Sequence, residues 1–503
     1  MHKLLSHIIK ERNWTPSMLT RTDLRNPASL KGTERVSRRL ANAITGNEKI
    51  VVFGDYDMDG ITSTLLLVDG LRRLGADVSY VIPKREDGYG LSREAVKDIN
   101  CNVLITVDNG IAAADVIDDL PQDVIVLDHH AIPERVPNAY AIVNPELGYH
   151  TPLSGSGVAH AVLRSLYEFV GAYGNMPRLM SDIDLAGIGT MADAVPLVGE
   201  NRALAIRALR LIQSGSRPGI QALKTVLGIK DPVYSRDVIW RIVPTLNSAS
   251  RMIDDVGPVI ELLSTRKVDT ALRLADNLDR MNNARRELVQ QHLSAVEDDV
   301  PIIVGTFMPG IIGLLAARYA SGRKLAVVLS EDKDGFYRGS FRGDRSFDVL
   351  SSLSGMCESF GGHPGAGGLR IRKDVFPEWA ERVREMASKV TIERRLPYEF
   401  IVPASWLTPE SISELSLLEP FGAGNETPVM MVEGPASIVR SFRTRAGSPC
   451  HEIKVGGSKA IWWGATSDSL PDRIIVSYNS RYGLTLVEPE SFAEASAESS
   501  VTV

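Results

Sequence analysis

Seven acidic or imidazole side chains stand where short apolar runs of this 503-residue chain end: Asp55, Asp57, Asp59, Asp108, Asp128, His129 and His130. The three runs, residues 49–53, 104–107 and 124–127, are rich in Val and Ile and do not alternate with polar residues. Such runs are typical of strands buried on both faces of a parallel sheet, whose carboxyl ends meet at one edge. The pattern therefore predicts one cluster of carboxylates and imidazoles, a ligand set for two divalent cations that could hydrolyse a phosphodiester.

The spacing of the aspartates fits such a site. Asp57 and Asp59 are two residues apart, and Gly60 after them has no side chain that would crowd two carboxylates. Asp108 comes from the next strand and is placed to bridge two cations. Asp193 is a further carboxylate in an otherwise apolar segment. Because an unpaired charge in such surroundings is costly, a cation partner is expected there too.

Each motif alone has an ordinary explanation. An Asp-x-Asp pair is most often a solvated turn, and Asn109-Gly110 is a turn signal. A His-His pair usually lies on the surface or in the core, and Asp193 could cap a helix. Their joint occurrence at consecutive strand ends favours a metal site over these alternatives. The nitrogen of His129 suits manganese or zinc better than calcium.

The composition is that of an ordinary globular protein, with 44% hydrophobic and 23% charged residues. No apolar run approaches the ~18 residues of a membrane span, and the N-terminus lacks the apolar core of a signal peptide. Cys101, Cys357 and Cys450 are scattered, which argues against a disulfide framework or a zinc cluster and favours a reducing cytoplasm. A net charge of −6 argues against unselective coating of nucleic acid but leaves room for a local basic groove.

The order of strand-like and helix-like runs predicts five structured regions and a tail. They are a helical lead-in at 1–45, a βαβ-type catalytic domain at 46–205, a helical connector with a long bridging helix at 206–295, a second small α/β domain at 296–395, a β-barrel at 396–490 and a disordered tail at 491–503. Within the catalytic domain, residues 61–74 are predicted to form the first crossover helix.

Four segments resemble the successive motifs of the DHH phosphoesterase superfamily: residues 54–60 (GDYDMDG), 107–110 (VDNG), 128–130 (DHH) and 192–193 (AD). Further segments resemble its RecJ branch: residues 83–91, 153–159, 244–252, 339–342, 361–363 and 419–425. The resemblance covers about residues 46–487, and only the joint pattern separates the RecJ branch from shorter relatives. In segment 153–159, glycines at a helix start expose N–H groups that could receive a phosphate, or they allow close helix packing.

This resemblance implies an α/β architecture: a parallel-sheet DHH domain, a long bridging helix, a smaller α/β DHH-associated domain and a C-terminal β-barrel of the oligonucleotide-binding type. It implies a 5′-to-3′ exonuclease that degrades single-stranded DNA to mononucleotides with two Mn²⁺ or Mg²⁺ ions, in DNA recombination and repair. Single-stranded DNA is the implied partner, and a single-strand-binding protein or a helicase is a candidate further partner. We expect a cytoplasmic monomer that binds no membrane.

The resemblance also implies a role for each residue of the cluster. The implied metal ligands are Asp55, Asp57, Asp59, Asp108, His129 and Asp193. Asp108 would bridge the two cations, with Asp57 and Asp55 (a ligand or an orienting group) at one cation and the remaining three residues at the other. His130 would complete the catalytic set as a donor to the phosphate or a proton relay, and Asp128 would orient the imidazoles without binding metal.

Residues outside the cluster are expected to bind DNA: Arg85, Ser340, Arg342, Gly362 and His363. A guanidinium matches the geometry of phosphate oxygens, and glycines let the backbone approach them. A fixed pocket for a terminal phosphate would make the enzyme cleave from a chain end. The barrel adds candidates for a DNA track: Arg440, Arg443, Arg445, Lys454, Lys459, Trp462 and Trp463. The alternative is that the basic residues form an ordinary charged surface and that the tryptophans lie in the barrel core. Since adjacent strand residues face opposite ways, at least one of the two tryptophans is expected in the core.

Two positions depart from the family pattern. Gly343 stands where a second serine is common, and residues 365–368 replace a commoner Ala-Ala-Gly ending, which bears on the phosphate contacts rather than on the metals. The chain also ends soon after the barrel, whereas many bacterial relatives carry a further domain.

Two other functions remain as alternatives. A DHH phosphodiesterase acting on short oligonucleotides or cyclic dinucleotides would usually lack the bridging segment and the barrel. A catalytically silent DNA-binding scaffold would have lost metal ligands, yet every expected ligand position is filled. Metal preference, processivity, activity on RNA and the cellular or phage pathway are left open by the sequence.

Overall fold

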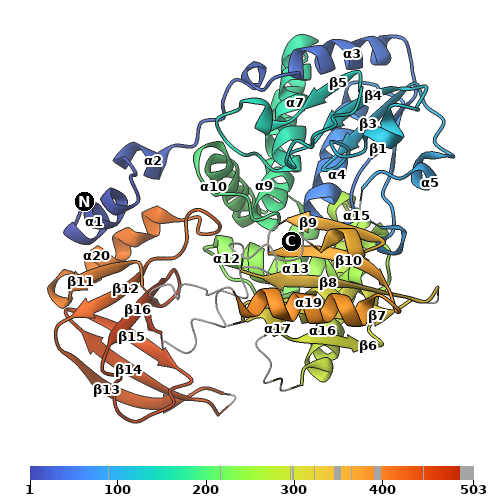
Figure 1. Ribbon diagram of the computed structural model, residues 1–503. Coiled ribbons are helices and arrows are strands. Elements are labelled where there is room, and N and C mark those ends of the chain that lie inside the picture. The colour runs from blue at the N-terminus through green and yellow to red at the C-terminus, as the bar shows by residue number, and fades with distance from the viewer. Residues whose placement is uncertain are drawn as a thin grey trace. The chain divides into compact units, whose positions relative to one another are not determined.

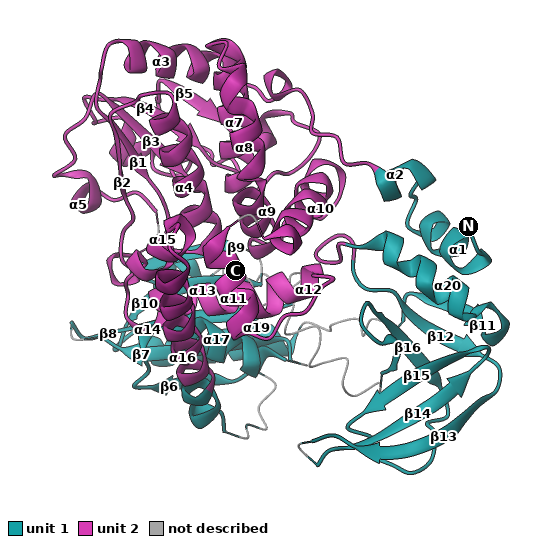
Figure 2. Ribbon diagram, turned by 180° about the vertical axis from the view of Figure 1, so that it is seen from behind, with its two compact units in different colours: residues 1–20, 287–419, 426–502 teal, residues 21–286, 420–425, 503 magenta. Residues whose placement is uncertain are grey.

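The computed structural model describes residues 1–88, 90–215, 217–294, 296, 300–321, 323–332, 334–344, 353–363, 365–389, 398–445 and 447–487. The predicted tail at 491–503, Tyr89, Pro364 and the side chain of His363 lie outside the described residues. The chain forms two compact units (Figure 2). Unit 1 comprises residues within 1–20, 287–419 and 426–502, and unit 2 comprises residues within 21–286 and 420–425.

Unit 2 is built on a five-stranded parallel sheet in the order β2-β1-β3-β4-β5 (Figure 1). The strands are β1 Ile50–Phe53, β2 Val78–Val81, β3 Val103–Val107, β4 Asp123–Leu127 and β5 Ala141–Val143. Every residue of β1 and β3, and all of β4 except Asp123, is buried, as the unalternating apolar runs predicted. Phe53 pairs with Thr106, and Val107 pairs with Leu127. The carboxyl ends of these three strands therefore lie at one edge of the sheet.

Helices cover both faces of this sheet. They are η1 Pro27–Ser29, α3 Thr33–Thr45, α4 Met58–Arg73, η2 Arg85–Asp87, α5 Arg93–Val96, α6 Ala114–Ile117, η3 Pro145–Leu147, α7 Gly155–Phe169, η4 Tyr173–Asn175, α8 Met176–Ser181, α9 Ile183–Ala192 and α10 Gly199–Ser214. Ile50 and Val52 share a core with α3, α4, α7 and α9. Val51 and Phe53, which alternate with them, share a second core with α5 and α6. The period of two along each strand thus divides its side chains between two apolar layers.

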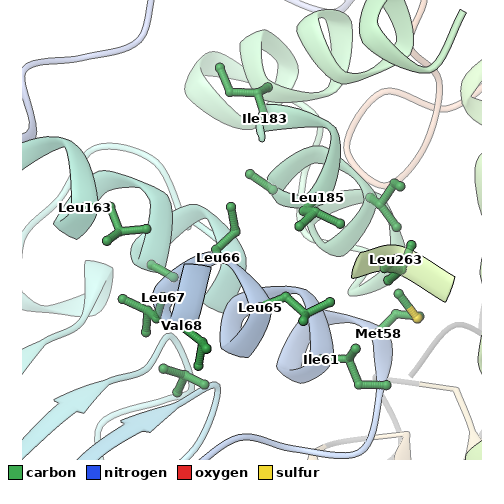
Figure 3. Packing of buried hydrophobic residues seen from close by; sticks show 14 of the residues in the cluster. Met58, Ile61, Leu65, Leu66, Leu67, Val68, Leu163, Ile183, Leu185 and Leu263 are labelled. Carbon is green, nitrogen blue, oxygen red and sulfur yellow. The ribbon is translucent and has the colours of Figure 1, made fainter. Parts of the chain in front are cut away.

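Helix α4 lies at the centre of the larger core (Figure 3). Its side chains Leu66 and Leu67 lie near Leu163 of α7, while Leu65 lies near Leu185 of α9. The helix was predicted at 61–74 but begins at Met58, because the side chain of Asp57 caps it by accepting a hydrogen bond from the Gly60 N–H at 3.0 Å. A buried helix therefore starts directly at a predicted metal ligand.

The rest of unit 2 is helical, as the loss of strand signals predicted. The helices are α11 Pro218–Val226, α12 Ser235–Asp237, the π-helix η5 Val238–Ile242, α13 Val243–Leu246, α14 Ser248–Met252, α15 Gly257–Ser264 and α16 Val268–His292. Helix α16 has 25 residues and is the predicted bridging helix, because it belongs to unit 2 up to Arg286 and to unit 1 from Glu287. No helix within the described ranges combines the length and apolar character that crossing a membrane requires.

Unit 1 contains the predicted second α/β region. Its strands β6 Ile302–Gly305, β7 Leu325–Glu331, β8 Phe336–Gly343, β9 Ser359–His363 and β10 Ala366–Arg372 form a sheet in the order β6-β7-β8-β10-β9. Only β6 and β7 are parallel, and the other pairs are antiparallel. Helix α17 Pro309–Ala320 shares a core with Ala326 and Val328, and α19 Phe376–Ser388 shares another with Val327 and Leu329. A short helix, η6 Ser354–Met356, precedes β9.

Unit 1 also contains a β-rich C-terminal region of the kind expected for oligonucleotide binding. Its strands are β11 Phe400–Pro403, β12 Val429–Glu433, β13 Ala436–Arg443, β14 Pro449–Val455, β15 Ser458–Trp463, β16 Ile474–Asn479 and β17 Gly483–Leu486. They form a mixed sheet in the order β11-β12-β16-β17-β15-β14-β13. The helices here are η7 Ala404–Trp406, α20 Pro409–Glu414 and η8 Leu415–Leu418. The N-terminal helices α1 Lys3–Glu11 and α2 Pro16–Thr20 belong to this unit, where α1 packs against α20.

Candidate metal centre

The structure brings the predicted ligands together at the carboxyl edge of the parallel sheet of unit 2. Three groups offer nitrogen or oxygen atoms that all lie within 4.8 Å of one another: Asp55, Asp57 and Asp108; Asp59, His129 and Asp193; Asp108, His129 and His130. Asp108 and His129 each belong to two groups, so the three groups form one continuous cluster. The side chains of Asp55, Asp59 and Asp108 are buried.

The electrostatics of this cluster fit a bound cation. Both carboxylate oxygens of Asp55 are buried and, among the described residues, lack a hydrogen bond of good geometry. Burial, and then the charge of Asp57, raise the pKa of Asp55 to about 8. Burial likewise raises the pKa of Asp59 and Asp108, and that of Asp193 to about 7. Carboxylates that repel each other in a dry site are stabilised as anions by divalent cations, so the donor set fits such ions.

The start of helix α7 holds Asp59. The backbone N–H groups of Gly155 and Ser156 donate to the two carboxylate oxygens of Asp59, at 2.6 and 3.0 Å. The positive end of the helix dipole thus lies against a buried anion. The prediction that N–H groups at this helix start receive a phosphate is therefore wrong for Gly155 and Ser156, because both donate to Asp59. The alternative, that glycine allows close packing, is supported at Gly155, where a Cβ atom would lie 2.8 Å from the Cβ of Asp108.

Glycines let the carboxylates approach one another. A Cβ atom at Gly155 would lie 2.8 Å from the Cβ of Asp108. At Gly189 of α9 it would lie 2.5 Å from Oδ1 of Asp59 and 2.3 Å from the hydroxyl oxygen of Ser156. At Gly60 it would lie 2.6 Å from the backbone oxygen of Asp55, which agrees with the prediction that a side chain there would crowd the site. Any larger residue at these positions would displace a ligand.

Asp108 and His129 form the middle of the cluster. Nε2 of His129 lies 3.0 Å from Oδ1 of Asp108, 3.6 Å from Oδ2 of Asp193 and 4.0 Å from Oδ2 of Asp59. Asp108 follows β3 with a φ of 60°, in the left-handed region that only a small share of non-glycine residues adopt. Asp193 is the C-terminal cap of α9 rather than an N-terminal cap. The residue after a strand, the first turn of one helix and the end of another helix therefore meet around one imidazole.

Asp128 is stabilised by hydrogen bonds instead. Its carboxylate accepts hydrogen bonds from the backbone N–H groups of Ile111, His129 and His130 at 2.9, 2.7 and 3.2 Å, and Nδ1 of His130 lies 2.7 Å from its Oδ1. Burial alone would raise the pKa of Asp128, but the His130 side chain and the other donors lower it to about 2. Burial would lower the pKa of His130, whereas Asp128 raises it to about 9. The described contacts of Asp128 thus orient the ring of His130, while the ring of His129 contacts Asp108.

Arg85 belongs to unit 2, as the cluster does. Its Cζ is 4.2 Å from the centroid of the Tyr56 ring, and Tyr56 stands between Asp55 and Asp57 in the sequence. Tyr56 was not among the predicted site residues, although its place inside the motif was a signal that could have identified it.

The other predicted phosphate-binding residues belong to unit 1. Arg342 of β8 donates from Nη1 to the Ser340 hydroxyl and to the Phe341 carbonyl oxygen, both at 2.8 Å, and the Ser340 hydroxyl donates to the Gly367 carbonyl at 2.7 Å. Burial lowers the pKa of Arg342 to about 10. Gly362 has a φ of 140°, and a Cβ there would lie 2.4 Å from the Ala366 carbonyl oxygen. Gly362 is therefore required by the backbone of β9, and its contact with a phosphate stays a prediction.

The candidates on the C-terminal sheet differ in exposure. Trp462 is 2% exposed and Trp463 is 42% exposed, so the prediction that at least one of the two lies in the core is confirmed. Trp463 contacts Tyr482, which is 57% exposed, in an edge-to-face arrangement at 5.4 Å. Arg440 and Lys459 both pair with Glu452. An exposed aromatic pair therefore lies on this sheet.

The parallel sheet and the cluster at its edge define a metal-binding protein of the DHH class. The model of the DHH family, N-terminal domain, matches residues 49–188. The single-stranded-DNA-specific exonuclease RecJ of Thermus thermophilus is 31% identical over 92% of this chain and 71% of that protein. The enzyme of the same name from Bacillus subtilis is 33% identical over 82% of this chain, which spans 55% of that relative's length. The crystal structure of Thermus thermophilus RecJ in complex with Mn²⁺ matches with a TM-score of 0.82 and 27% identity, over 97% of this chain and 76% of that one. The chain belongs to the RecJ family.

The raised pKa of Asp55 predicts how pH affects the metal-free protein. The pKa is 3.8 in the unfolded chain and about 8 in the folded one, so the folded state keeps a proton that the unfolded state loses as pH rises between these values. The free energy of unfolding should therefore fall from pH 4 to pH 8. Asp55→Asn should reduce this fall by about 1–3 kcal/mol, as measured by urea unfolding in EDTA at a series of pH values. Parallel curves for the two proteins would contradict this interpretation.

The close approach at Gly189 predicts that Gly189→Ala disrupts the metal centre. The added methyl group would displace Asp59 or Ser156, and we expect about a 10- to 100-fold loss of Mn²⁺ affinity in calorimetric titration. Gly174→Ala is the matched control, because a Cβ there would meet nothing within 4 Å. Equal Mn²⁺ affinity of the two variants would show that the packing at Gly189 does not position the ligands.

Proposed function

We propose that this chain is a 5′-to-3′ exonuclease that degrades single-stranded DNA to mononucleotides by two-metal-ion hydrolysis. The observation that carries the proposal is the cluster of closely spaced carboxylates and imidazoles at one sheet edge of a RecJ family member, in which the oxygens of Asp55 are buried without a hydrogen-bond partner among the described residues. The relatives from Thermus thermophilus and Bacillus subtilis are named as single-stranded-DNA-specific exonucleases, which supports this substrate class.

Two divalent cations are the proposed cofactors, with Mn²⁺ or Mg²⁺ as the candidates. The Thermus thermophilus relative has been solved in complex with each of these ions, which supports the choice. When bound, such ions would activate a water molecule and neutralise charge on the leaving oxygen. Asp55 and Asp57 would hold one ion, Asp59, His129 and Asp193 the other, and Asp108 both. Asp55, Asp57 and Asp108 form one group of atoms within 4.8 Å, Asp59, His129 and Asp193 form another, and Asp108 also shares a group with His129, which supports this division.

The chain's own residues would position the scissile phosphate. His130, with a pKa of about 9, carries a proton at neutral pH and could donate it in a hydrogen bond to a phosphate oxygen. The short contact with Asp128 fixes the orientation of this ring. Asp128 itself, with a pKa of about 2, remains an anion and does not compete for the proton.

Arginines would bind the phosphates of the strand. Among the described residues, Arg85 makes no ion pair with a carboxylate, so its charge remains available to an anion. Ser340, Arg342, Gly362 and His363 are proposed to hold a terminal phosphate, which would explain cleavage from an end.

Further partners and location follow from the same proposal. A protein that digests single strands in recombination and repair would meet a single-strand-binding protein or a helicase. We propose that it acts as a monomer in the cytoplasm, and three free cysteines agree with a reducing compartment.

Digestion of end-labelled DNA tests the function. With Mn²⁺, a single strand labelled at the 5′ end should release labelled mononucleotide at once, a 3′-labelled strand should do so only late, and a duplex or a dinucleotide should react far more slowly. Asp108→Ala should lower the rate by about 100-fold or more while single-strand binding is retained. The exposed Asp98→Ala, on the same unit, serves as the charge-matched control. An Asp108→Ala protein as active as the wild type would rule out the bridging role, and preferred hydrolysis of the dinucleotide would favour the short-substrate alternative.

The exposed aromatic pair predicts a separate effect on DNA binding. Because base–aromatic stacking contributes about 1–3 kcal/mol, Trp463→Ala should weaken the binding of a single-stranded oligonucleotide about 5- to 100-fold. Tyr173→Ala, which removes an aromatic ring that is 66% exposed on unit 2, should leave the affinity unchanged. Fluorescence anisotropy with a labelled strand in the presence of EDTA measures this without hydrolysis. An unchanged affinity of Trp463→Ala would show that this indole does not bind the DNA strand.

A further inference from the structure

The side chain of Arg85 is held by contacts other than a hydrogen bond to a carboxylate. Its guanidinium lies over the Tyr56 ring at 4.2 Å, and its Nε donates to the Ser250 hydroxyl at 3.2 Å. Its backbone N–H donates to Asp254. Among the described residues, its two terminal nitrogens have no hydrogen-bond partner and no ion pair. An arginine whose stem is fixed while its terminal nitrogens stay unused suits the bidentate recognition of phosphate.

Asp254 fixes the backbone that carries this arginine. Its Oδ1 accepts the N–H of Arg85 at 2.6 Å, and its Oδ2 accepts the N–H of Glu86 at 3.1 Å. One carboxylate therefore binds two successive amides at the start of η2, from a position 169 residues further along the chain. Asp254 itself has a φ of 50°, in the left-handed region that aspartate and asparagine tolerate best among non-glycine residues.

We propose that Asp254 is a positioning residue that holds Arg85 against Tyr56, so that the terminal nitrogens of Arg85 remain aligned for a phosphate of the DNA strand. This inference rests on the proposed function, in which Arg85 binds the substrate. The charge of Asp254 is satisfied by backbone amides, so it does not neutralise the guanidinium as a side-chain ion pair would. The helical connector thereby sets the geometry of a residue beside the metal centre.

Asp254→Asn tests the inference with a single atom exchange. Asparagine tolerates the same backbone conformation, so the variant is expected to fold, but an NH₂ donor replaces one of the two oxygens, so at least one of the two N–H groups loses its acceptor. Asp255→Asn is the matched control: it removes the neighbouring charge, and Asp255 accepts the Gly257 N–H at 2.8 Å rather than an amide of η2. Ser250→Ala, which removes only the partner of the Arg85 Nε, is a second variant that leaves Asp254 in place.

Hydrogen exchange gives a readout without substrate or activity. In Asp254→Asn, at least one of the Arg85 and Glu86 amides should exchange about tenfold faster or more, because it loses its acceptor. In Asp255→Asn their exchange should match the wild type. Unchanged exchange in Asp254→Asn would overturn the inference, whatever the enzyme's activity proves to be.

Kinetics on a 5′-phosphorylated single-stranded oligodeoxynucleotide test whether Asp254 acts through Arg85. Asp254→Asn should raise KM about three- to tenfold with kcat within about twofold, and Ser250→Ala should raise KM less. In an Arg85→Ala background, Asp254→Asn should have no further effect on KM. If Asp254→Asn speeds amide exchange but its effect on KM adds to that of Arg85→Ala, Asp254 does not act through Arg85. That result would overturn the inference. If the wild-type protein digests no single-stranded DNA, the proposed function is overturned. The inferred effect of Asp254 on substrate binding through Arg85 would then fall with it.

Discussion

The central constraint of the structure is the repulsion among carboxylates that are crowded, and mostly buried, at one sheet edge. Burial raises the pKa of Asp55, Asp59, Asp108 and Asp193, and the charges of neighbouring aspartates add to it. A fold could avoid this repulsion by exposing the groups to water or by pairing each with an arginine. This chain does neither at Asp55, whose oxygens are buried without a hydrogen bond of good geometry in the described part of the chain. A divalent cation between these carboxylates would relieve the repulsion.

Hydrogen bonds from the surrounding elements stabilise one buried carboxylate fully as an anion, but they leave the pKa of another raised. Asp128 receives three backbone N–H groups and an imidazole, which lower its pKa to about 2. Asp59 receives two N–H groups from the start of α7, yet its pKa stays raised because burial outweighs them. Asp128 thus serves as a permanent anion beside His130, while Asp59 still gains from a cation. The glycines at 155 and 189 allow this arrangement, since a methyl group at either position would overlap the carboxylates.

Arg85, which we assign to phosphate binding, makes no side-chain ion pair among the described residues. Its guanidinium contacts an aromatic face and a hydroxyl, and its backbone N–H donates to Asp254. Arg217, by contrast, is buried between Asp182 and Asp184 and serves the packing of unit 2. Contacts that orient a guanidinium without neutralising it leave its charge for a substrate anion.

The sequence by itself indicated three of the five strands of the parallel sheet and the acidic and imidazole residues that follow them, because unalternating Val- and Ile-rich runs and short acidic motifs are local patterns. It also indicated that one of the adjacent tryptophans lies in the core, since neighbouring strand residues face opposite ways. Only the tertiary structure decided which atoms share a cluster, that the amides of Gly155 and Ser156 serve Asp59, and that Asp254 holds the Arg85 backbone. The hydrogen bonds to Asp59 and to Asp254 join segments 96 to 169 residues apart. No local pattern encodes them, because they exist only once the connector and the sheet have packed together.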